Sequence, residues 1–489
     1  HEMGSAREVH NIYNNLWAEL LHSKTRENYP QKRLFNLTRS GYAGMQRYST
    51  YPWSGDIQRS FSGLQQQIPI MLHSGASGVG YMHSDLGGFT GGGQNDELYT
   101  RWLQLGTFSP IMRAHGHGVP PEPIFYDNQV QQHVRKAIAM RYDFLPYNYT
   151  LAWQYATTGR PLARPMDYYK PGDAALAAIN DQFFWGEDVL VAPVLQQGAS
   201  SRMVVLPEGR WAAYGSGAVH QGGQSLTVQA PLGEIPVFLR GGGFVVQSRE
   251  YLPHTKMYDS DSIRIRHFIP ADGGQNQALW YHDDGQTAGN VASRQYNLME
   301  MSAARTGEQT TLRLEQKEAH ISSPERQVEW MVYGLGDAPG DISLNGAPVQ
   351  RYQQKSSYDN APTGAFWQAP FLYVHFQWKD TAAVLRMDGS VPAALAEKPA
   401  HGLDLLVSPN PVRPASQVTL SVSQPGLHTL SVFGADGRRL ASNSLRLQRG
   451  KHRFPLSDLF PFGQAGKGLY IIQLDNGEQK QHFRMIKRE

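Results

Sequence analysis

The stretch Gly78-Val-Gly-Tyr-Met-His-Ser-Asp-Leu-Gly-Gly-Phe89 decides the fold class predicted for this chain. Its first half, residues 78–83, is apolar and β-prone, which predicts a buried strand. Helical patterns flank it over residues 56–72 and 96–108. Because strand and helix alternate, we expect βα units that build a parallel sheet.

The same alternation extends in both directions from this stretch. Apolar residues at helical spacing predict an amphipathic helix over residues 6–22, and a short strand is predicted over residues 33–39. A further helical region covers residues 129–157. We therefore expect residues 1–180 to form one α/β domain.

Beyond about residue 181 the sequence becomes all-β, with short apolar strands between turns that carry Gly and Pro. We predict a first β-sandwich over residues 181–248 and a second over 249–388. Residues 389–403 are rich in alanine and carry two prolines, so they are predicted to be a linker. Residues 404–489 are predicted to form a small immunoglobulin-like β-sandwich.

Composition limits the partners. The 489 residues carry 45 basic and 42 acidic side chains spread along the chain, a net charge of +3, which argues against a nucleic-acid partner. There are no cysteines, so disulfides and zinc bound through cysteine are excluded. No apolar run reaches about 18 residues, so no transmembrane helix is expected. Aromatic residues make up 11% of the chain, and their flat faces suit sugar rings as well as cores.

Four polar residues stand where successive strands of the α/β domain would end, which is where βα barrels collect their active sites. They are Arg39 in Leu37-Thr-Arg-Ser40, Asp56 in Tyr51-Pro-Trp-Ser-Gly-Asp56, Asp85 in His83-Ser-Asp-Leu-Gly-Gly-Phe89 and His115 in Met112-Arg-Ala-His-Gly116. In this order the four motifs resemble glycoside hydrolase family 31, the α-glucosidase and α-xylosidase family. The resemblance covers roughly residues 1–390 and includes Gln182-Phe-Phe-Trp-Gly-Glu-Asp-Val-Leu-Val-Ala-Pro-Val194.

The resemblance implies a fold and a reaction. The fold is the C-terminal half of a (β/α)8 barrel, followed by two β-sandwiches and the small immunoglobulin-like sandwich. The reaction is hydrolysis of an α-linked oligosaccharide or polysaccharide with retention, in which one carboxylate attacks and a second, about 5.5 Å away, acts as acid and then as base. No cofactor or metal is implied.

The family's roles carry over onto six residues of this sequence. Asp56 matches the acid/base, and we expect burial beside Trp53 to favour its protonated form. Asp85 and His115 match residues that bind hydroxyls of the cleaved sugar, and Arg39 matches the arginine that binds sugar and steadies the acid/base. Trp53 and Phe89 are expected to wall the pocket.

Simpler roles stay open for the same residues. Asp56 precedes a predicted helix and has the residue type of an N-cap. Asp85 is followed by two glycines, as a turn residue often is. The pair His115-Gly-His117 has the residue type of metal ligands but lacks a carboxylate at ligand spacing.

The family's nucleophile is missing from these residues. It is an aspartate in an Asp-x-Gly-Glu-Pro-Glu-like motif just before the helix predicted at Ala6, but no aspartate precedes Asp56 here. His1-Glu2 is similar to the tail of that motif. We therefore expect the nucleophile and the first half of the barrel to lie upstream, and this chain alone to be inactive.

The substrate is narrowed but not fixed. The run from Trp53 to Leu64, followed by His83-Ser-Asp85, resembles the branch of α-glucosidases and oligosaccharide 4-α-glucosyltransferases. Hydrolysis of terminal α-glucose is the favoured prediction, with 4-α-glucosyl transfer and α-xylosidase activity as alternatives. A rival of another class is a non-catalytic surface protein that binds glycans.

The C-terminal region carries a second resemblance. Val407-Ser-Pro-Asn-Pro411, Leu430-Ser-Val-Phe-Gly-Ala-Asp-Gly-Arg438 and Gly468-Leu-Tyr-Ile-Ile-Gln-Leu474 resemble the sorting domain of the type IX secretion system of Bacteroidetes. This implies the secretion machinery as a partner and a secreted or outer-membrane-surface location in a Gram-negative cell. A carbohydrate-binding sandwich is the alternative.

Overall fold

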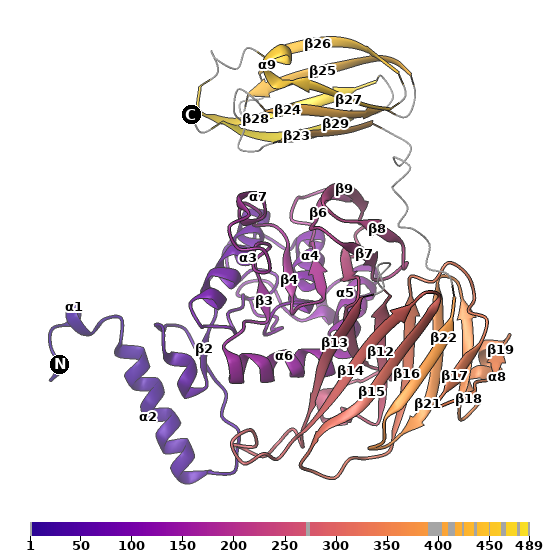
Figure 1. The fold of residues 1–489 in the computed structure, drawn as a ribbon. Helices are drawn as coiled ribbons and strands as arrows, with labels where there is room; N and C mark the ends of the chain where they lie inside the picture. The colour runs from indigo at the N-terminus through magenta and orange to yellow at the C-terminus, as the bar shows by residue number, and fades with distance from the viewer. Residues whose placement is uncertain are drawn as a thin grey trace. The chain divides into compact units, whose positions relative to one another are not determined.

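The computed structural model describes residues 2–269, 274–389, 403–408, 416–422, 425–434, 438–448, 450–460, 466–476 and 480–487 (Figure 1). The chain divides into two compact units, described separately below: His1–Gly172 with Ile179–Ala394, and Leu395–Glu489 with Asp173–Ala178, which includes α7 (Ala174–Ala177). No described helix is long and apolar enough to span a membrane. The predicted linker falls almost wholly on residues 390–402, outside the described residues.

Four short segments at the start of the first unit run parallel, as the predicted barrel segment requires. Strand β1 (Asn36–Thr38) pairs in parallel with β2 (Thr50–Pro52). Parallel bridges from Trp53 to His83 and from Leu86 to Ala114 continue the row. Because all four segments point the same way, the residues that follow them gather at one edge.

Helices connect and flank these segments. Their bounds are α1 (Ala6–Val9), α2 (Tyr13–Asn28), α3 (Phe61–Ala76), α4 (Asp96–Thr107), α5 (Asn128–Asp143) and α6 (Leu145–Thr158), with 3-10 turns η1 (Met45–Tyr48) and η2 (Pro123–Phe125). The side chain of Ser60 accepts a hydrogen bond from the Gly63 N–H and caps α3. The helix therefore begins at Phe61, and Asp56 is not its N-cap.

The strand predicted over residues 78–83 is wrong, because this segment is a turn that reaches the sheet only at His83. Gly78 has a φ of +84°, which ends any extended run. A Cβ at Gly80 would lie 2.6 Å from the Tyr155 ring, so the backbone passes directly against that side chain. The two glycines serve a tight turn and a close approach rather than a strand.

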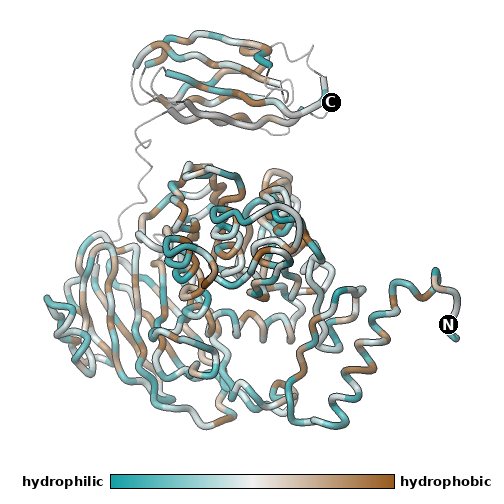
Figure 2. Tube along the Cα trace, turned by 180° about the vertical axis from the view of Figure 1, so that it is seen from behind, coloured by the Kyte–Doolittle hydropathy of each residue, from teal (hydrophilic) through white to brown (hydrophobic). Residues whose placement is uncertain are grey.

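The helix predicted over residues 6–22 exists mainly as α2, but its apolar face is exposed. Tyr13, Trp17 and Leu20 are 60%, 56% and 47% accessible. Figures 1 and 2 show α2 at the margin of the unit, with apolar residues along it, and it contacts the neighbouring turn η1. Amphipathic spacing thus predicted the helix correctly, and its apolar face is exposed in this structure.

A six-stranded sheet follows the helices and shares their core. Its order is β3 (Ala163–Arg164), β4 (Phe183–Trp185), β5 (Val189–Val191), β10 (Val237–Arg240), β7 (Arg210–Ala213) and β8 (Val219–Gln221), and β6 (Ser201–Leu206) pairs with β9 (Gln224–Gln229). Trp185 and Leu239 of this sheet lie in the same apolar cluster as Trp102 and Phe108 of the α4 region. This shared core fixes the sheet against the barrel segment.

Two further six-stranded sheets form the second sandwich. One has the order β11 (Phe244–Ser248), β12 (Ser262–Phe268), β16 (Arg326–Tyr333), β21 (Phe371–Trp378), β20 (Gly364–Gln368) and β19 (Arg351–Tyr352). The other has the order β13 (Gln275–His282), β14 (Asn297–Thr306), β15 (Gln309–Ala319), β22 (Ala383–Asp388), β17 (Ile342–Leu344) and β18 (Ala347–Pro348). The connections contain η3 (Thr255–Met257) and α8 (Lys355–Asp359). Both sheets contribute to one core, with Val328 and Trp330 from the first and Leu312 and Leu314 from the second.

The second unit is a smaller sandwich. A three-stranded sheet has the order β23 (Leu403–Ser408), β24 (Gln417–Val422) and β27 (Gly450–Pro455), and a four-stranded sheet has the order β26 (Arg439–Leu447), β25 (Gly426–Gly434), β28 (Gly468–Asp475) and β29 (Lys480–Lys487). The helix α9 (Leu456–Leu459) follows β27. Leu420, Val432 and Ile472 lie in its core. The predicted fold class is thus confirmed.

Candidate active site and family membership

Arg39 and Asp56 follow neighbouring parallel strands and form an ion pair. Arg39 comes directly after β1, and its Nη2 donates a hydrogen bond to Asp56 Oδ2 at 2.6 Å. The side chains are 63% and 36% exposed, so solvent reaches both partners. The prediction that Asp56 is buried beside Trp53 is therefore wrong, because the carboxylate faces Arg39 at the open edge of the segment.

Asp85 is the buried carboxylate of this edge. Its side chain is fully inaccessible, and Oδ1 accepts a hydrogen bond from Arg113 Nη2. Burial raises the pKa of Asp85, and the positive charge of Arg113 opposes that rise. His115 and Asp56 also act electrostatically on Asp85: the first lowers its pKa and the second raises it.

Three buried polar atoms around Asp85 make no hydrogen bond of normal geometry within the described residues: Asp85 Oδ2, the indole Nε1 of Trp53 and the hydroxyl of Ser54. The Trp53 indole still acts on the Asp85 carboxylate as a weak hydrogen-bond donor, which lowers the pKa of Asp85 and opposes the effect of burial. The Arg113 guanidinium lies 5.2 Å from the centroid of the Trp53 ring. Buried polar groups normally make well-formed hydrogen bonds, so a carboxylate oxygen, an indole N–H and a hydroxyl without them mark a place where a polar ligand can bind.

Phe89 and His115 form the other wall. Their rings stack with centroids 5.4 Å apart, and Phe89 also stacks on His117 at 6.2 Å. Arg59 holds this wall, because its guanidinium donates four hydrogen bonds to the carbonyls of Phe89, Gly91, Gly92 and His117. The six predicted residues thus lie in one group, which we name the strand-end cluster: Arg39, Trp53, Asp56, Asp85, Phe89 and His115.

Arg113 and His83 belong to the same site, although the sequence argument did not select them. Arg113 Nε also lies 3.4 Å from His83 Nε2, within hydrogen-bond distance. Burial, and then the charge of Arg113, lower the pKa of His83 to about 4, so its ring is neutral at pH 7. Each residue stands two positions before a cluster member on an extended segment. Residues two apart on an extended segment point to the same face, so Arg113 lies on the face of His115 and His83 on that of Asp85. This spacing could have identified Arg113 and His83 from the sequence.

Trp102 has a supporting position rather than a place in the wall. It lies on α4, is 0% exposed and donates from its indole Nε1 to Ser84 Oγ at 3.0 Å. Ser84 immediately precedes Asp85. The indole therefore fixes the strand end from behind.

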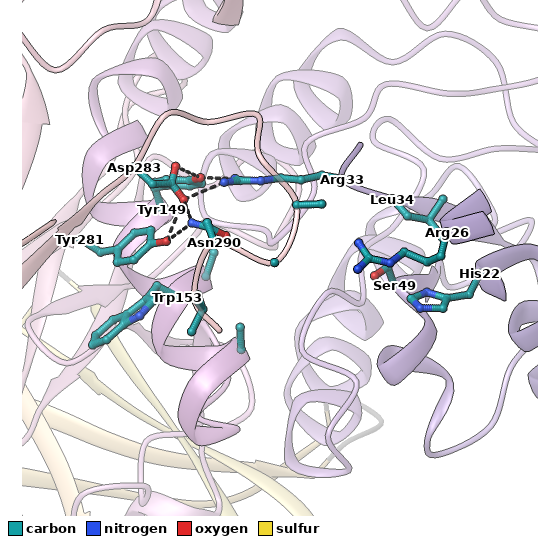
Figure 3. Close-up of a pocket in the computed structure, with 15 residues that line it drawn as sticks. His22, Arg26, Arg33, Leu34, Ser49, Tyr149, Trp153, Tyr281, Asp283 and Asn290 are labelled. Carbon is teal, nitrogen blue, oxygen red and sulfur yellow. Dashed lines mark hydrogen bonds and ion pairs between the residues drawn. The ribbon is translucent and has the colours of Figure 1, made fainter. Parts of the chain in front are cut away.

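A second buried carboxylate lies in the turn Tyr281-His-Asp-Asp-Gly285 of the second sandwich (Figure 3). Asp283 accepts hydrogen bonds from Arg33 at 2.7 Å, Tyr149 at 2.6 Å and Tyr281 at 2.7 Å. Asn290 and the Gly285 N–H also donate to it. We name Asp283 and these four side chains, Arg33, Tyr149, Tyr281 and Asn290, the Asp283 network; it ties the sandwich to the barrel segment.

The described residues contain no group of three or more His, Asp or Glu side chains that could hold a metal ion. His115 and His117 instead flank the Phe89 ring. The oxygens of Asp283 are occupied by protein donors, and Asp284 accepts from the N–H groups of Gln286 and Thr287. Asp283 and Asp284 thus stabilise the turn and its packing.

Comparison with known proteins identifies the family. The Glycosyl hydrolases family 31 TIM-barrel domain matches residues 1–151, and the Glycosyl hydrolase family 31 C-terminal domain matches residues 159–245. The chain is 35% identical over 283 residues to Alpha-glucosidase 2 of Bacillus thermoamyloliquefaciens, which is 58% of this chain and 35% of that protein. It is 30% identical over 340 residues to the Alpha-xylosidase of Saccharolobus solfataricus, which is 68% of this chain and 46% of that protein.

A solved structure agrees with these matches. The GH31 dextranase of Flavobacterium johnsoniae, complexed with glucose, superposes with a TM-score of 0.74 at 27% identity. The match covers 80% of this chain and 50% of the dextranase. The chain thus spans half or less of these three relatives, and through residues 1–151 and 159–245 it belongs to glycoside hydrolase family 31.

Proposed function

We propose that the strand-end cluster binds the terminal sugar of an α-linked glucoside and supplies the acid/base for its hydrolysis with retention. The observation that carries this proposal is Asp85 Oδ2, which is buried beside the Trp53 indole, makes no hydrogen bond of normal geometry in the described residues and lies one strand away from Asp56. A sugar hydroxyl donates to one of these groups and accepts from the other. The family membership and the α-glucosidase and α-xylosidase relatives support the substrate class.

Five residues of the cluster have distinct roles in this reaction. Asp56 gives its proton to the glycosidic oxygen as a nucleophilic carboxylate bonds to the anomeric carbon and the glycosidic bond breaks. Water then attacks the anomeric carbon, gives its proton to Asp56 and frees the nucleophile. Arg39 holds Asp56 in place at 2.6 Å and stabilises it while it is charged. Asp85 and His115 grip hydroxyls, and Phe89 covers one face of the sugar.

Binding is the measurement that tests the site directly. Hydrogen exchange of the 489-residue chain with maltotriose is expected to protect residues 83–90 and 113–117. Asp85→Asn is expected to weaken this protection, since a charge-assisted hydrogen bond contributes about 1.5–3 kcal/mol, or roughly ten- to a hundredfold in affinity. Asp284→Asn, a change in an exposed turn, is the control. Unprotected strand ends in the wild-type chain would contradict the proposal.

Turnover separates hydrolysis from its alternatives. The chain and its Asp56→Asn variant are incubated with maltotetraose, and no turnover is expected from either. Turnover that disappears in the variant would place a nucleophile within these residues and correct the upstream prediction. Glucose as product would favour hydrolysis, longer oligosaccharides would favour 4-α-glucosyl transfer, and release of xylose from an α-xyloside would favour an α-xylosidase. Binding without turnover in a polypeptide that carries the nucleophile would favour the non-catalytic glycan binder.

We also propose that residues 404–489 are a type IX sorting domain, which directs the protein out of a Gram-negative, Bacteroidetes-like cell or onto its surface. The quoted motifs and the small two-sheet sandwich support this. Fused to a fluorescent protein in a Bacteroidetes host, the segment is expected to be exported only when the secretion system is intact. Retention in that host, together with binding to insoluble starch, would favour the carbohydrate-binding alternative.

A further inference from the structure

His83 lies beside the strand-end cluster without being one of its six members. The residue is buried, with 3% of its surface exposed. A parallel bridge joins its backbone to Trp53, and its carbonyl accepts a hydrogen bond from the Ser54 N–H at 2.9 Å. A histidine buried and fixed in this way either fills space or takes part in a chain of hydrogen bonds, and the partners of its ring decide between the two.

The partners of the His83 ring define its tautomer. Its pKa of about 4 leaves the ring neutral at pH 7, so one nitrogen carries a proton and the other accepts. Nε2 accepts a hydrogen bond from Arg113 Nε at 3.4 Å. The proton therefore lies on Nδ1, which makes no hydrogen bond of normal geometry in the described residues. The backbone of Tyr81 and Pro52 acts on the ring as a weak hydrogen-bond acceptor.

The guanidinium of Arg113 is held at three points. Nη2 donates to Asp85 Oδ1, Nε donates to His83 Nε2, and the central carbon lies 5.2 Å from the centroid of the Trp53 ring. The Arg113 side chain is 25% exposed, so water can compete for its remaining donors. One hydrogen bond to a carboxylate leaves a guanidinium free to turn, whereas a second bond from Nε fixes its plane.

The orientation of Arg113 decides which oxygen of Asp85 is left for a ligand. Arg113 donates to Oδ1, and Oδ2 makes no hydrogen bond of normal geometry in the described chain. We infer that His83 is a positioning residue, which acts through Arg113 to keep Asp85 Oδ2 turned toward a sugar hydroxyl. This inference rests on the proposed function, because it requires a sugar bound at Asp85.

Two variants separate the acceptor nitrogen of His83 from the volume of its ring. His83→Phe fills the space without an acceptor, and it is expected to weaken maltotriose binding about three- to tenfold, the equivalent of one hydrogen bond. His83→Gln keeps an acceptor oxygen for Arg113 and a donor for the backbone, so its affinity should stay within about twofold of the wild type. Titration calorimetry of the 489-residue chain measures these affinities. His73→Phe, which changes an exposed histidine of α3, is the control and should bind as the wild type does.

A double-mutant cycle tests the path through Arg113. Arg113→Met removes the guanidinium, so adding His83→Phe to it is expected to change the affinity by less than about twofold. An equal effect of His83→Phe with and without Arg113 would overturn the inference. Arg113→Lys supplies a measurement that does not depend on the folding of a His83 variant. It keeps the positive charge but lacks the Nε donor, and an affinity equal to that of the wild type would also overturn the inference.

The same titrations separate this inference from the proposed function. No maltotriose binding by the wild-type chain would contradict the proposed function and the inference that rests on it. Binding that His83→Phe leaves unchanged would overturn the inference alone. Equal losses in His83→Phe and His83→Gln, with wild-type circular dichroism spectra in both, would also overturn it, because a lost acceptor cannot explain them.

Discussion

Asp85 and Asp283 are both buried aspartates with an arginine partner. They differ in the hydrogen bonds that their other carboxylate oxygen accepts. Asp283 has both oxygens saturated by tyrosine, asparagine, arginine and backbone donors. Asp85 has one oxygen paired to Arg113 and one without a hydrogen bond of normal geometry in the described chain. A saturated buried carboxylate stabilises the fold, whereas an unsaturated one is held ready for a ligand at some cost in stability.

The largest loss of stability is expected when Asp283, whose two carboxylate oxygens are both hydrogen-bonded, is replaced. Asp283→Ala leaves the Arg33 charge and three side-chain donors without their acceptor, so the free energy of unfolding of the first unit should fall by about 3 kcal/mol. Urea unfolding followed by tryptophan fluorescence measures this change. Asp284→Ala, whose side chain is 51% exposed, is the control and should cost less than about 1 kcal/mol. Equal losses in the two variants would contradict the structural role of Asp283.

A smaller loss is expected when Asp85 loses its ion-pair partner, Arg113. Arg113→Met leaves a buried carboxylate uncompensated, and because Arg113 is 25% exposed we expect a loss of about 2 kcal/mol at pH 7. The loss should shrink as the pH falls, since protonation removes the buried charge. Thermal unfolding of variant and wild type from pH 4 to 7.5 checks this, and a loss independent of pH would contradict it.

Removing the charge of Asp85 itself should change stability by less than about 1 kcal/mol at pH 7. Burial raises the pKa of Asp85 above its usual 3.8, so the folded chain binds this proton more tightly than the unfolded chain does. Its contribution to stability therefore falls as the pH rises from about 3.8 through the raised pKa. Asp85→Asn should lack this decline. A variant as unstable as Asp283→Ala would show that Asp85 is a structural residue.

The smallest effect is expected for the exposed ion pair. Arg39 and Asp56 are 63% and 36% exposed, so water and salt screen their attraction. Arg39→Gln should leave the melting temperature unchanged within error at 0.15 M salt. A clear drop would show that the pair holds the strand ends together and is not reserved for chemistry.

The local parts of this comparison were predictable from the sequence. Arg39, Asp56, Asp85 and His115 were placed at strand ends, and the structure brings them together at one edge. Arg113 was open to the same reasoning, because residues two apart on an extended segment share a face. The resemblance to the family marks only His115 on that segment.

The non-local parts were not predictable. The partners of Asp283 include Arg33 and Tyr149, which are 250 and 134 positions away in the sequence. No pattern in a single sequence links such distant residues. The turn at Gly78 also escaped, since apolar neighbours suggested a strand and only the packing of Tyr155 against Gly80 excludes one. Amphipathic spacing likewise predicted the α2 helix but not the exposure of its apolar face.

Arg59 has a consequence for the thermodynamics of binding. The loop after Phe89 contains three successive glycines, Gly91 to Gly93, and such a loop normally has high conformational entropy. Four hydrogen bonds from one guanidinium fix its carbonyls together with that of His117. The cost of ordering the loop is thus met during folding rather than when a sugar arrives. Calorimetry of maltotriose binding should then give a small entropic penalty, and Arg59→Lys should enlarge that penalty more than it weakens the binding enthalpy.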